Sequence, residues 1–159
     1  MNRIDFNKYN RILGISTGIL SFVVFALTVE PTASYWDCAE YISTSAKLQI
    51  GHPPGAPLFQ MLGAIFSIFA LELNQIAYAV NMMSVLSSAL TIVFLFWSIS
   101  LIGKEILGLT NSLKKDEAIK VFGSSFLGSI SFTFTDSFWF NAVEAEVYAM
   151  ATLILAILF

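Results

Sequence analysis

Two long uncharged stretches constrain this chain more than any other feature of its sequence. Residues 12–29 and 76–102 contain no Asp, Glu, Lys or Arg and are mostly apolar. Because about 20 apolar residues in a helix cross the hydrocarbon core of a bilayer, both stretches predict membrane-spanning helices. The composition agrees, since 57% of the residues are hydrophobic, 12% are charged and the mean hydropathy is +0.76. We therefore expect an all-α polytopic membrane protein.

Two more apolar segments predict further spans, and two shorter ones predict helices that do not cross. Residues 121–138 suit a third span, and residues 145–159 begin a fourth that is cut off where the sequence ends. Residues 35–48 and 58–71 are short for a span and favour juxtamembrane helices, interfacial or re-entrant. We therefore expect residues 1–159 to be one transmembrane domain, the N-terminal part of a longer chain.

The distribution of basic residues predicts the orientation. If residues 58–71 do not cross, all eight Lys and Arg except Lys47 lie on one side, before the first span or in the 103–120 loop. The positive-inside rule then places that side, and the N-terminus, in the cytoplasm. Both acidic loops emerge together on the extracytoplasmic face. We expect a multi-pass protein of the cell inner (plasma) membrane, with the lipid bilayer as its first partner.

Charge and cysteine content exclude several function classes. The net charge is −3 and the basic residues are scattered, so no nucleic-acid partner is expected. The single cysteine, Cys38, can form no internal disulfide, and no zinc-ligand spacing accompanies it.

The first acidic loop carries two carboxylates at helical spacing. Ser34 and Asp37 resemble a capping box at the start of the 35–48 helix, which would place Asp37 and Glu40 on one face. They are candidate catalytic residues. Helix capping alone would also account for Asp37.

Two cationic candidates follow on the same loop. His52 is the single histidine and lies in a turn rich in proline and glycine, residues 51–57. It could donate to a diphosphate or shuttle a proton near neutral pH, or it could simply bond the turn's carbonyls. Lys47 could pair with a phosphate or be a solvated interfacial lysine.

The second acidic loop offers a metal-binding pattern. Glu144 and Glu146 would be about 200° apart on a regular helix, so they converge only across a loop-to-helix junction. Two such carboxylates suit Mg²⁺ or Mn²⁺, which prefer oxygen ligands, although most such pairs are solvated surface charges. Tyr148 shares a helix face with Glu144 and is a further substrate-binding candidate.

Residues 36–40, Trp-Asp-Cys-Ala-Glu, followed by residues 47–58, which include Gly-His-Pro-Pro-Gly-Ala-Pro-Leu, resemble the signature of a bacterial multi-pass membrane family of unknown function related to protein O-mannosyltransferases. The resemblance implies a GT-C glycosyltransferase fold with an extracytoplasmic active site. It also implies a sugar donor carried on a polyprenyl phosphate and an acceptor protein or glycan. Asp37 falls where such enzymes place the acid that acts on the acceptor, with Glu40 beside it. Glu144 and Glu146 fall where some relatives hold a divalent metal.

These residues suggest a mechanism. Asp37 would act as general base on an acceptor hydroxyl, and a retaining route would recruit Glu40 as nucleophile. A metal at Glu144 and Glu146, or His52 with Lys47, would stabilise the leaving phosphate.

Two rival functions remain. The first is a membrane transporter or channel whose outer-loop acids bind ions, but the predicted spans carry no charge at mid-depth. The second is a structural subunit that packs through the Ser- and Gly-rich residues 121–135, which leaves the acids without a role.

Overall fold

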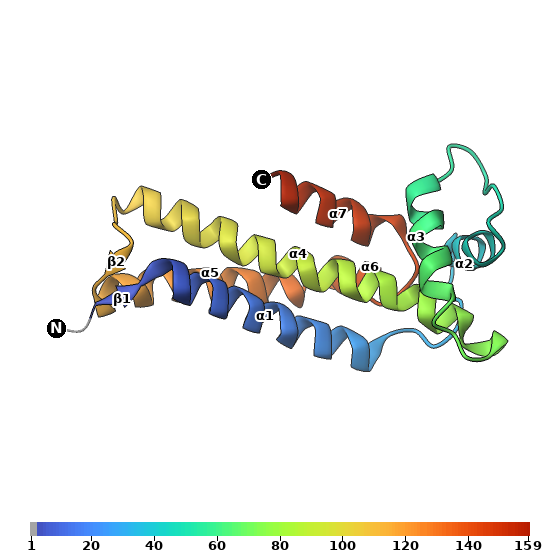
Figure 1. Ribbon diagram of the computed structural model, residues 1–159, viewed down its shortest axis with the longest axis horizontal. Coiled ribbons are helices and arrows are strands. Elements are labelled where there is room, and N and C mark those ends of the chain that lie inside the picture. Colours follow the sequence, from blue (N-terminus) through green and yellow to red (C-terminus); the bar gives the residue numbers. More distant parts are fainter. Residues whose placement is uncertain (1–2) are drawn as a thin grey trace.

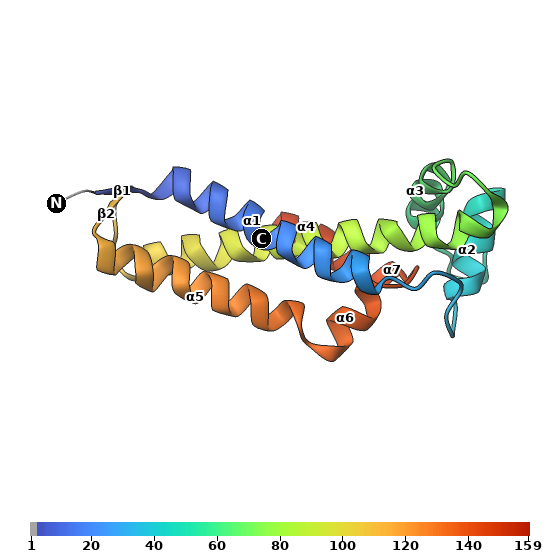
Figure 2. The ribbon, with the colours of Figure 1, turned by 90° about the horizontal axis from the view of Figure 1, so that it is seen from below.

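The computed structural model describes residues 3–159, which form an elongated helical bundle (Figure 1). Helices α1, α4, α5 and α7 follow the long axis and alternate in direction, whereas α2 and α3 lie together at one end (Figures 1 and 2). In chain order, the elements are β1 Ile4–Asp5, α1 Phe6–Thr28, α2 Cys38–Lys47, α3 Pro57–Ser67, the 3₁₀ helix η1 Leu73–Gln75, α4 Ile76–Ile106, β2 Ser112–Leu113, α5 Lys115–Thr133, α6 Asp136–Ala142 and α7 Val147–Leu158.

The expected all-α membrane class is confirmed. Two helical segments, Phe6–Thr28 and Leu73–Ile106, are long and apolar enough to cross a membrane. Helices α6 and α7 meet the same criterion only as a pair, bent by 109° at the break between them. Helix α5 is not in this set, and its first turn carries charge, with the Lys114 amide donating to the Glu117 carboxylate at 2.7 Å.

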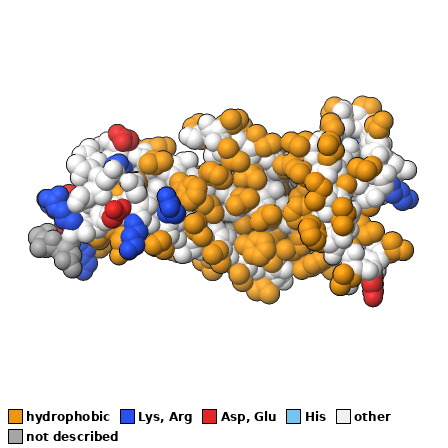
Figure 3. All heavy atoms as spheres, viewed as in Figure 1, with side chains coloured by type: hydrophobic (Ala, Val, Ile, Leu, Met, Phe, Trp, Pro, Cys, Tyr) orange, Lys and Arg blue, Asp and Glu red, His pale blue; other side chains and the backbone are white. Residues whose placement is uncertain are grey.

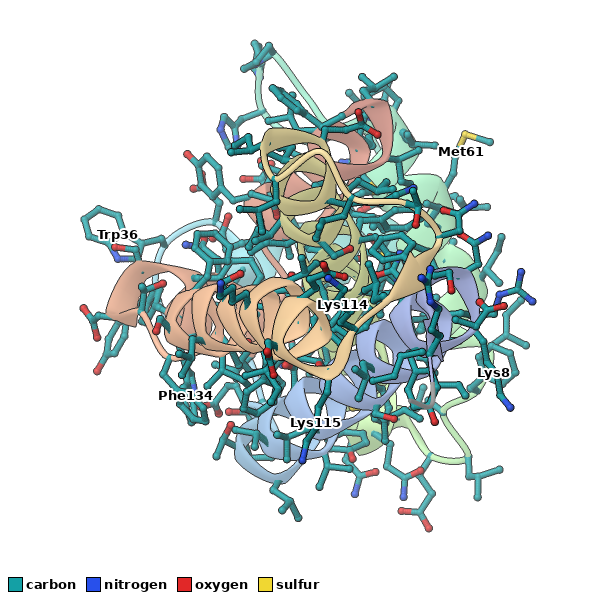
Figure 4. The ribbon with its side chains drawn as sticks, turned by 90° about the vertical axis from the view of Figure 1, so that its left-hand side faces the viewer. Lys8, Trp36, Met61, Lys114, Lys115 and Phe134 are labelled. Carbon is teal, nitrogen blue, oxygen red and sulfur yellow. The ribbon has the colours of Figure 1, made fainter. Side chains whose placement is uncertain are left out.

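Charged side chains gather at the two ends of the bundle, and hydrophobic side chains cover its middle (Figure 3). One end holds β1, β2 and the first turns of α1 and α5, and we call it the basic end. Lys8, Lys114 and Lys115 lie there, as the view from that side shows (Figure 4). The opposite end, formed by residues 30–75 and 134–146, is called the acidic end. An apolar middle between polar ends is the surface that a bilayer requires.

Close helix contacts hold the bundle together. Glycine at position 18 lets α1 approach α4, because a Cβ there would lie 3.2 Å from the carbonyl oxygen of Ala89. Trp97 donates from Nε1 to the carbonyl of Asn10 at 3.1 Å. Ser21 of α1 and Thr133 of α5 share a buried hydrogen bond of 3.0 Å. Small residues and hydroxyl pairs of this kind are the usual contacts between helices in membranes.

Several boundaries differ from the sequence expectation. The helix expected over 35–48 begins at Cys38, because Trp36 adopts a left-handed φ of 61° that a helix cannot contain. Ser34 is not its cap; the Ser34 hydroxyl donates instead to Glu144 of the second acidic loop. The expected 58–71 helix ends at Ser67 and lies across the acidic end.

The third and fourth expected spans are also divided differently. Helix α5 extends from Lys115 to Thr133, and the chain then turns before the separate helix α6, so residues 121–138 are not one helix. The final helix, α7, begins at Val147. Because the long helices alternate in direction, residues 30–75 and 134–146 lie at the same end of the bundle.

Candidate active site

The two acidic loops meet at the acidic end around one cavity of about 310 Å³. One wall comes from the start of α2 and the other from the turn between α6 and α7. The lining residues are Trp36, Asp37, Tyr41, Phe140, Asn141, Glu144, Glu146, Val147 and Tyr148. Carboxylates and aromatic rings converge on this space, a composition suited to a polar ligand with apolar faces.

The segment before Asp37 is held by a buried amide on α4. The Asn81 side chain donates from Nδ2 to the carbonyls of Glu30 at 2.7 Å and Thr32 at 2.9 Å. Cys38, also buried, directs its thiol toward Asn81 Oδ1 at 3.9 Å. The sequence analysis did not single out Asn81. The available signal was an amide placed in an otherwise apolar span, where an unpaired polar group is costly.

Replacing Asn81 with leucine should lower the stability of the acidic end by about 1–3 kcal/mol, because two backbone carbonyls would lose their donor. The measurement is the midpoint of thermal unfolding of the full-length protein in detergent. Asn74→Leu is the matched control, since Asn74 is exposed on η1. Equal midpoints for the two variants would contradict this role.

Asp37, Glu40 and His52 form a compact group beside the cavity. Glu40 accepts twice from His52: from the backbone N–H at 2.6 Å and from Nδ1 at 2.8 Å. The other ring nitrogen, Nε2, faces Asp37 Oδ2 at 3.9 Å. Hydrogen bonds from His52 lower the pKa of Glu40, and the same contact with Glu40 raises the pKa of His52. Across residues 3–159, these three side chains are also the group whose ligand atoms, all within 4.8 Å of one another, could hold a cation.

Glu144 and Glu146 occupy the turn that leads into α7. Glu144 is 2% exposed, and while one carboxylate oxygen accepts from Ser34, Oε1 has no hydrogen-bond partner. Burial raises the pKa of Glu144. Burial and the neighbouring carboxylates of Glu144 and Asp37 raise the pKa of Glu146 to about 7. The two acids face one cavity because they straddle the junction, where the Glu146 amide donates to the Glu144 carbonyl at 2.9 Å.

Of the remaining candidates, Tyr148 lies at the cavity and Lys47 lies away from it. Tyr148 lines the cavity and is 61% exposed. Lys47 is the last residue of the ten-residue helix α2, at the opposite end of that helix from Asp37, and it does not line the cavity. Trp36, which precedes Asp37 in the chain, is exposed and projects outward from the bundle (Figure 4). Its left-handed backbone is costly for a bulky residue, as is common where a turn positions a functional group.

The matches to known proteins reported below are all to protein O-mannosyl-transferases. A family described as the Protein O-mannosyl-transferase TMEM260 N-terminal domain matches residues 37–159. The protein O-mannosyl-transferase tmem260 of Dictyostelium discoideum is 26% identical over 138 residues, which is 86% of this chain and 15% of that protein. The Mus musculus protein O-mannosyl-transferase TMEM260 is 27% identical over 136 residues, or 85% of this chain and 17% of that protein. No solved structure matches.

Proposed function

We propose a function for this chain, which belongs to the family of the Protein O-mannosyl-transferase TMEM260 N-terminal domain: it carries catalytic residues of a membrane glycosyltransferase that moves mannose from a polyprenyl-phosphate donor to a protein hydroxyl. Its relation to protein O-mannosyltransferases, expected from the sequence, is confirmed. The chain spans only 15% and 17% of the two relatives, so the activity belongs to the full-length protein. The observation that carries the proposal is the shared cavity of Asp37, Glu144 and Glu146.

Asp37 is the general base of the proposed reaction. Its side chain is 54% exposed at the mouth of the cavity, where an acceptor hydroxyl can reach it. Removing the hydroxyl proton as the oxygen attacks the anomeric carbon is a role typically worth about 10²- to 10⁴-fold in rate. A single displacement of this kind inverts the anomeric carbon. Tyr148, at the rim of the same cavity, is placed to contact the substrate.

Glu144 and Glu146 suit a divalent cation, Mg²⁺ or Mn²⁺. The buried Oε1 of Glu144 has no hydrogen-bond partner, and burial with the carboxylates of Glu144 and Asp37 raises the pKa of Glu146 to about 7. Carboxylate oxygens are the ligands that these cations prefer. When bound, such a cation supplies charge stabilisation to a departing phosphate.

The position of the cavity favours a lipid-linked donor on the extracytoplasmic side. The acidic end borders the apolar middle of the bundle, so a polyprenyl chain in the bilayer can present its phosphate at this level. The basic end then faces the cytoplasm, in agreement with the positive-inside rule. We also propose that the membrane in question is the cell inner (plasma) membrane.

The direct test is transfer by the purified full-length protein. Radiolabelled mannose would be supplied either on a polyprenyl phosphate or on a nucleotide, with membrane-protein extract from cells lacking the protein as acceptor. We expect label in precipitated protein from the lipid-linked donor and background label from the nucleotide-linked one. Label from the nucleotide donor alone would contradict the proposed donor, and label from neither would contradict the transferase.

The transporter alternative finds less support in the fold. The charged residues of these two helices lie in the first two turns of α1 and the last turn of α4, and their buried polar side chains are Ser and Thr hydroxyls and the Asn81 amide. An ion pathway usually includes an ionisable group at mid-depth. Ion flux by the reconstituted full-length protein would be the measurement that favours this alternative.

A further inference from the structure

We propose that Glu40 is a positioning residue that holds the imidazole of His52 toward Asp37, so that His52 receives the proton that Asp37 takes from the acceptor. This inference rests on the proposed transferase function. It changes the role expected for Glu40, which the sequence suggested as a second catalytic carboxylate. For His52 it favours the proton shuttle over the phosphate ligand, the two roles that the sequence left open.

Glu40 is fully engaged by one residue. Its Oε1 accepts from the backbone N–H of His52 at 2.6 Å and its Oε2 from the ring at 2.8 Å. The turn is tight at this point, since a Cβ on Gly51 would lie 2.8 Å from Glu40 Oε1 and 3.0 Å from Gln60 Nε2. A carboxylate that binds the backbone and the ring of one residue fixes both, and each of its oxygens already accepts a hydrogen bond.

The pairing also sets the tautomer of His52. An ionised carboxylate can only accept, so Nδ1 of the ring carries the hydrogen that Glu40 binds. In the neutral ring, Nε2 then holds the lone pair, and this is the atom that faces Asp37 Oδ2 at 3.9 Å. Both side chains are about half exposed, at 48% and 54%. One bridging water or a small side-chain movement would close this gap to hydrogen-bonding distance.

The proton balance of the step is simple. The acceptor O–H bond breaks as the oxygen bonds to the anomeric carbon, and the bond from that carbon to the phosphate oxygen breaks, which releases polyprenyl phosphate with the bonding electrons. The proton passes to Asp37 and then to Nε2 of His52. Transfer from a carboxylic acid to imidazole is downhill, because imidazolium is the weaker acid. His52 then releases the proton to water, and Asp37 is again ionised for the next turnover.

The charges around His52 predict how turnover depends on pH. The hydrogen bond with Glu40 and the nearby carboxylate of Asp37 are the causes that raise the pKa of His52. His52 must be neutral to accept the proton, so turnover rises as pH rises through this raised pKa. A variant in which Nε2 of His52 cannot accept should therefore lose that rise.

The test uses two variants that keep the shape of the group. In Glu40→Gln the amide NH₂ would donate to Nδ1, which places the hydrogen on Nε2 and prevents that atom from accepting. His52→Asn keeps a donor near the position of Nδ1 and lacks Nε2. For each variant of the full-length protein, we expect kcat to fall about tenfold or more while KM for polyprenyl-phosphate mannose is unchanged. The double variant should lose no more than either single one, because the two residues act as a unit.

Further readouts separate the alternatives. Glu40→Gln should retain activity that no longer rises through the raised pKa of His52, whereas Glu72→Gln, an exposed acid at the same end, should match the unaltered protein. A raised KM with unchanged kcat in His52→Asn would make His52 a phosphate ligand and overturn the inference. Losses that add in the double variant would do the same, as would recovery of Glu40→Gln in excess Mn²⁺, which would indicate a metal site.

If Asp37→Asn is inactive while Glu40→Gln and His52→Asn are fully active, only this inference fails. An active Asp37→Asn would contradict the role of Asp37 as general base, whereas an unaltered full-length protein without transfer would contradict the proposed transferase function itself.

Discussion

Replacing Asp37 with asparagine should lower mannose transfer by the full-length protein by about 10²- to 10⁴-fold. Asparagine has the same shape but cannot take a proton from the acceptor hydroxyl. The side chain of Asp37 caps no helix by a side-chain hydrogen bond, although it stands at the N-cap position of α2. Its loss should therefore leave folding intact. The measurement is kcat with polyprenyl-phosphate mannose, alongside the midpoint of thermal unfolding.

Asp136→Asn is the matched control for this variant. Asp136 is also an exposed acid at the acidic end and begins α6, but it does not line the cavity. It should keep kcat within about twofold. If the two variants lose activity equally, general negative charge at this end matters and Asp37 is not the base. If Asp37→Asn lowers the unfolding midpoint along with kcat, its loss of activity is structural.

The sequence could predict which loops share an end, because that depends on counting spans. Residues 12–29 and 76–102 stand out as uncharged, and they correspond to α1 and α4. The short length of residues 58–71 favoured a segment that does not cross, and α3 lies across the acidic end. Once these directions are set, the loop of Asp37 and the loop of Glu144 must emerge together. The direction of each span follows from the local hydropathy and from the charges that flank it, and tertiary contacts do not change that direction.

The sequence could not predict which side chains pair within that end. Ser34 matched a capping pattern, but its hydroxyl bonds Glu144, 110 residues later in the chain. Glu40 and His52 are 12 residues apart, on a helix and in a turn, so no periodicity relates them. Such pairs depend on how the turn of residues 51–57 folds back over α2. A short polar side chain can form a hydrogen bond either with the nearby backbone or with a residue that is distant in the sequence. Which bond forms depends on distances that exist only in the folded chain.

The buried acids of the second loop should lower the stability of the folded chain when they are ionised. Glu146 is 8% exposed, and burial with the neighbouring carboxylates of Glu144 and Asp37 raises its pKa from 4.5 to about 7. Between those values the unfolded chain ionises before the folded one. Stability of the metal-free protein therefore falls as pH rises from 4.5 to about 7 and is constant above, where the loss is about 1–3 kcal/mol.

Replacing Glu146 with glutamine should therefore raise the unfolding midpoint of the full-length protein in chelator at about pH 8, with a much smaller gain at about pH 5. The same variant should lower transfer by at least about 10- to 100-fold and weaken its dependence on Mn²⁺, as loss of a metal ligand does. Thermal unfolding and a Mn²⁺ titration of transfer check the two parts, with Glu72→Gln as the control acid. A variant that is more stable but less active would identify Glu146 as a metal ligand. The loss of a residue that only packs would lower both stability and activity. A variant that is more stable and equally active would assign the metal, if any, to other residues.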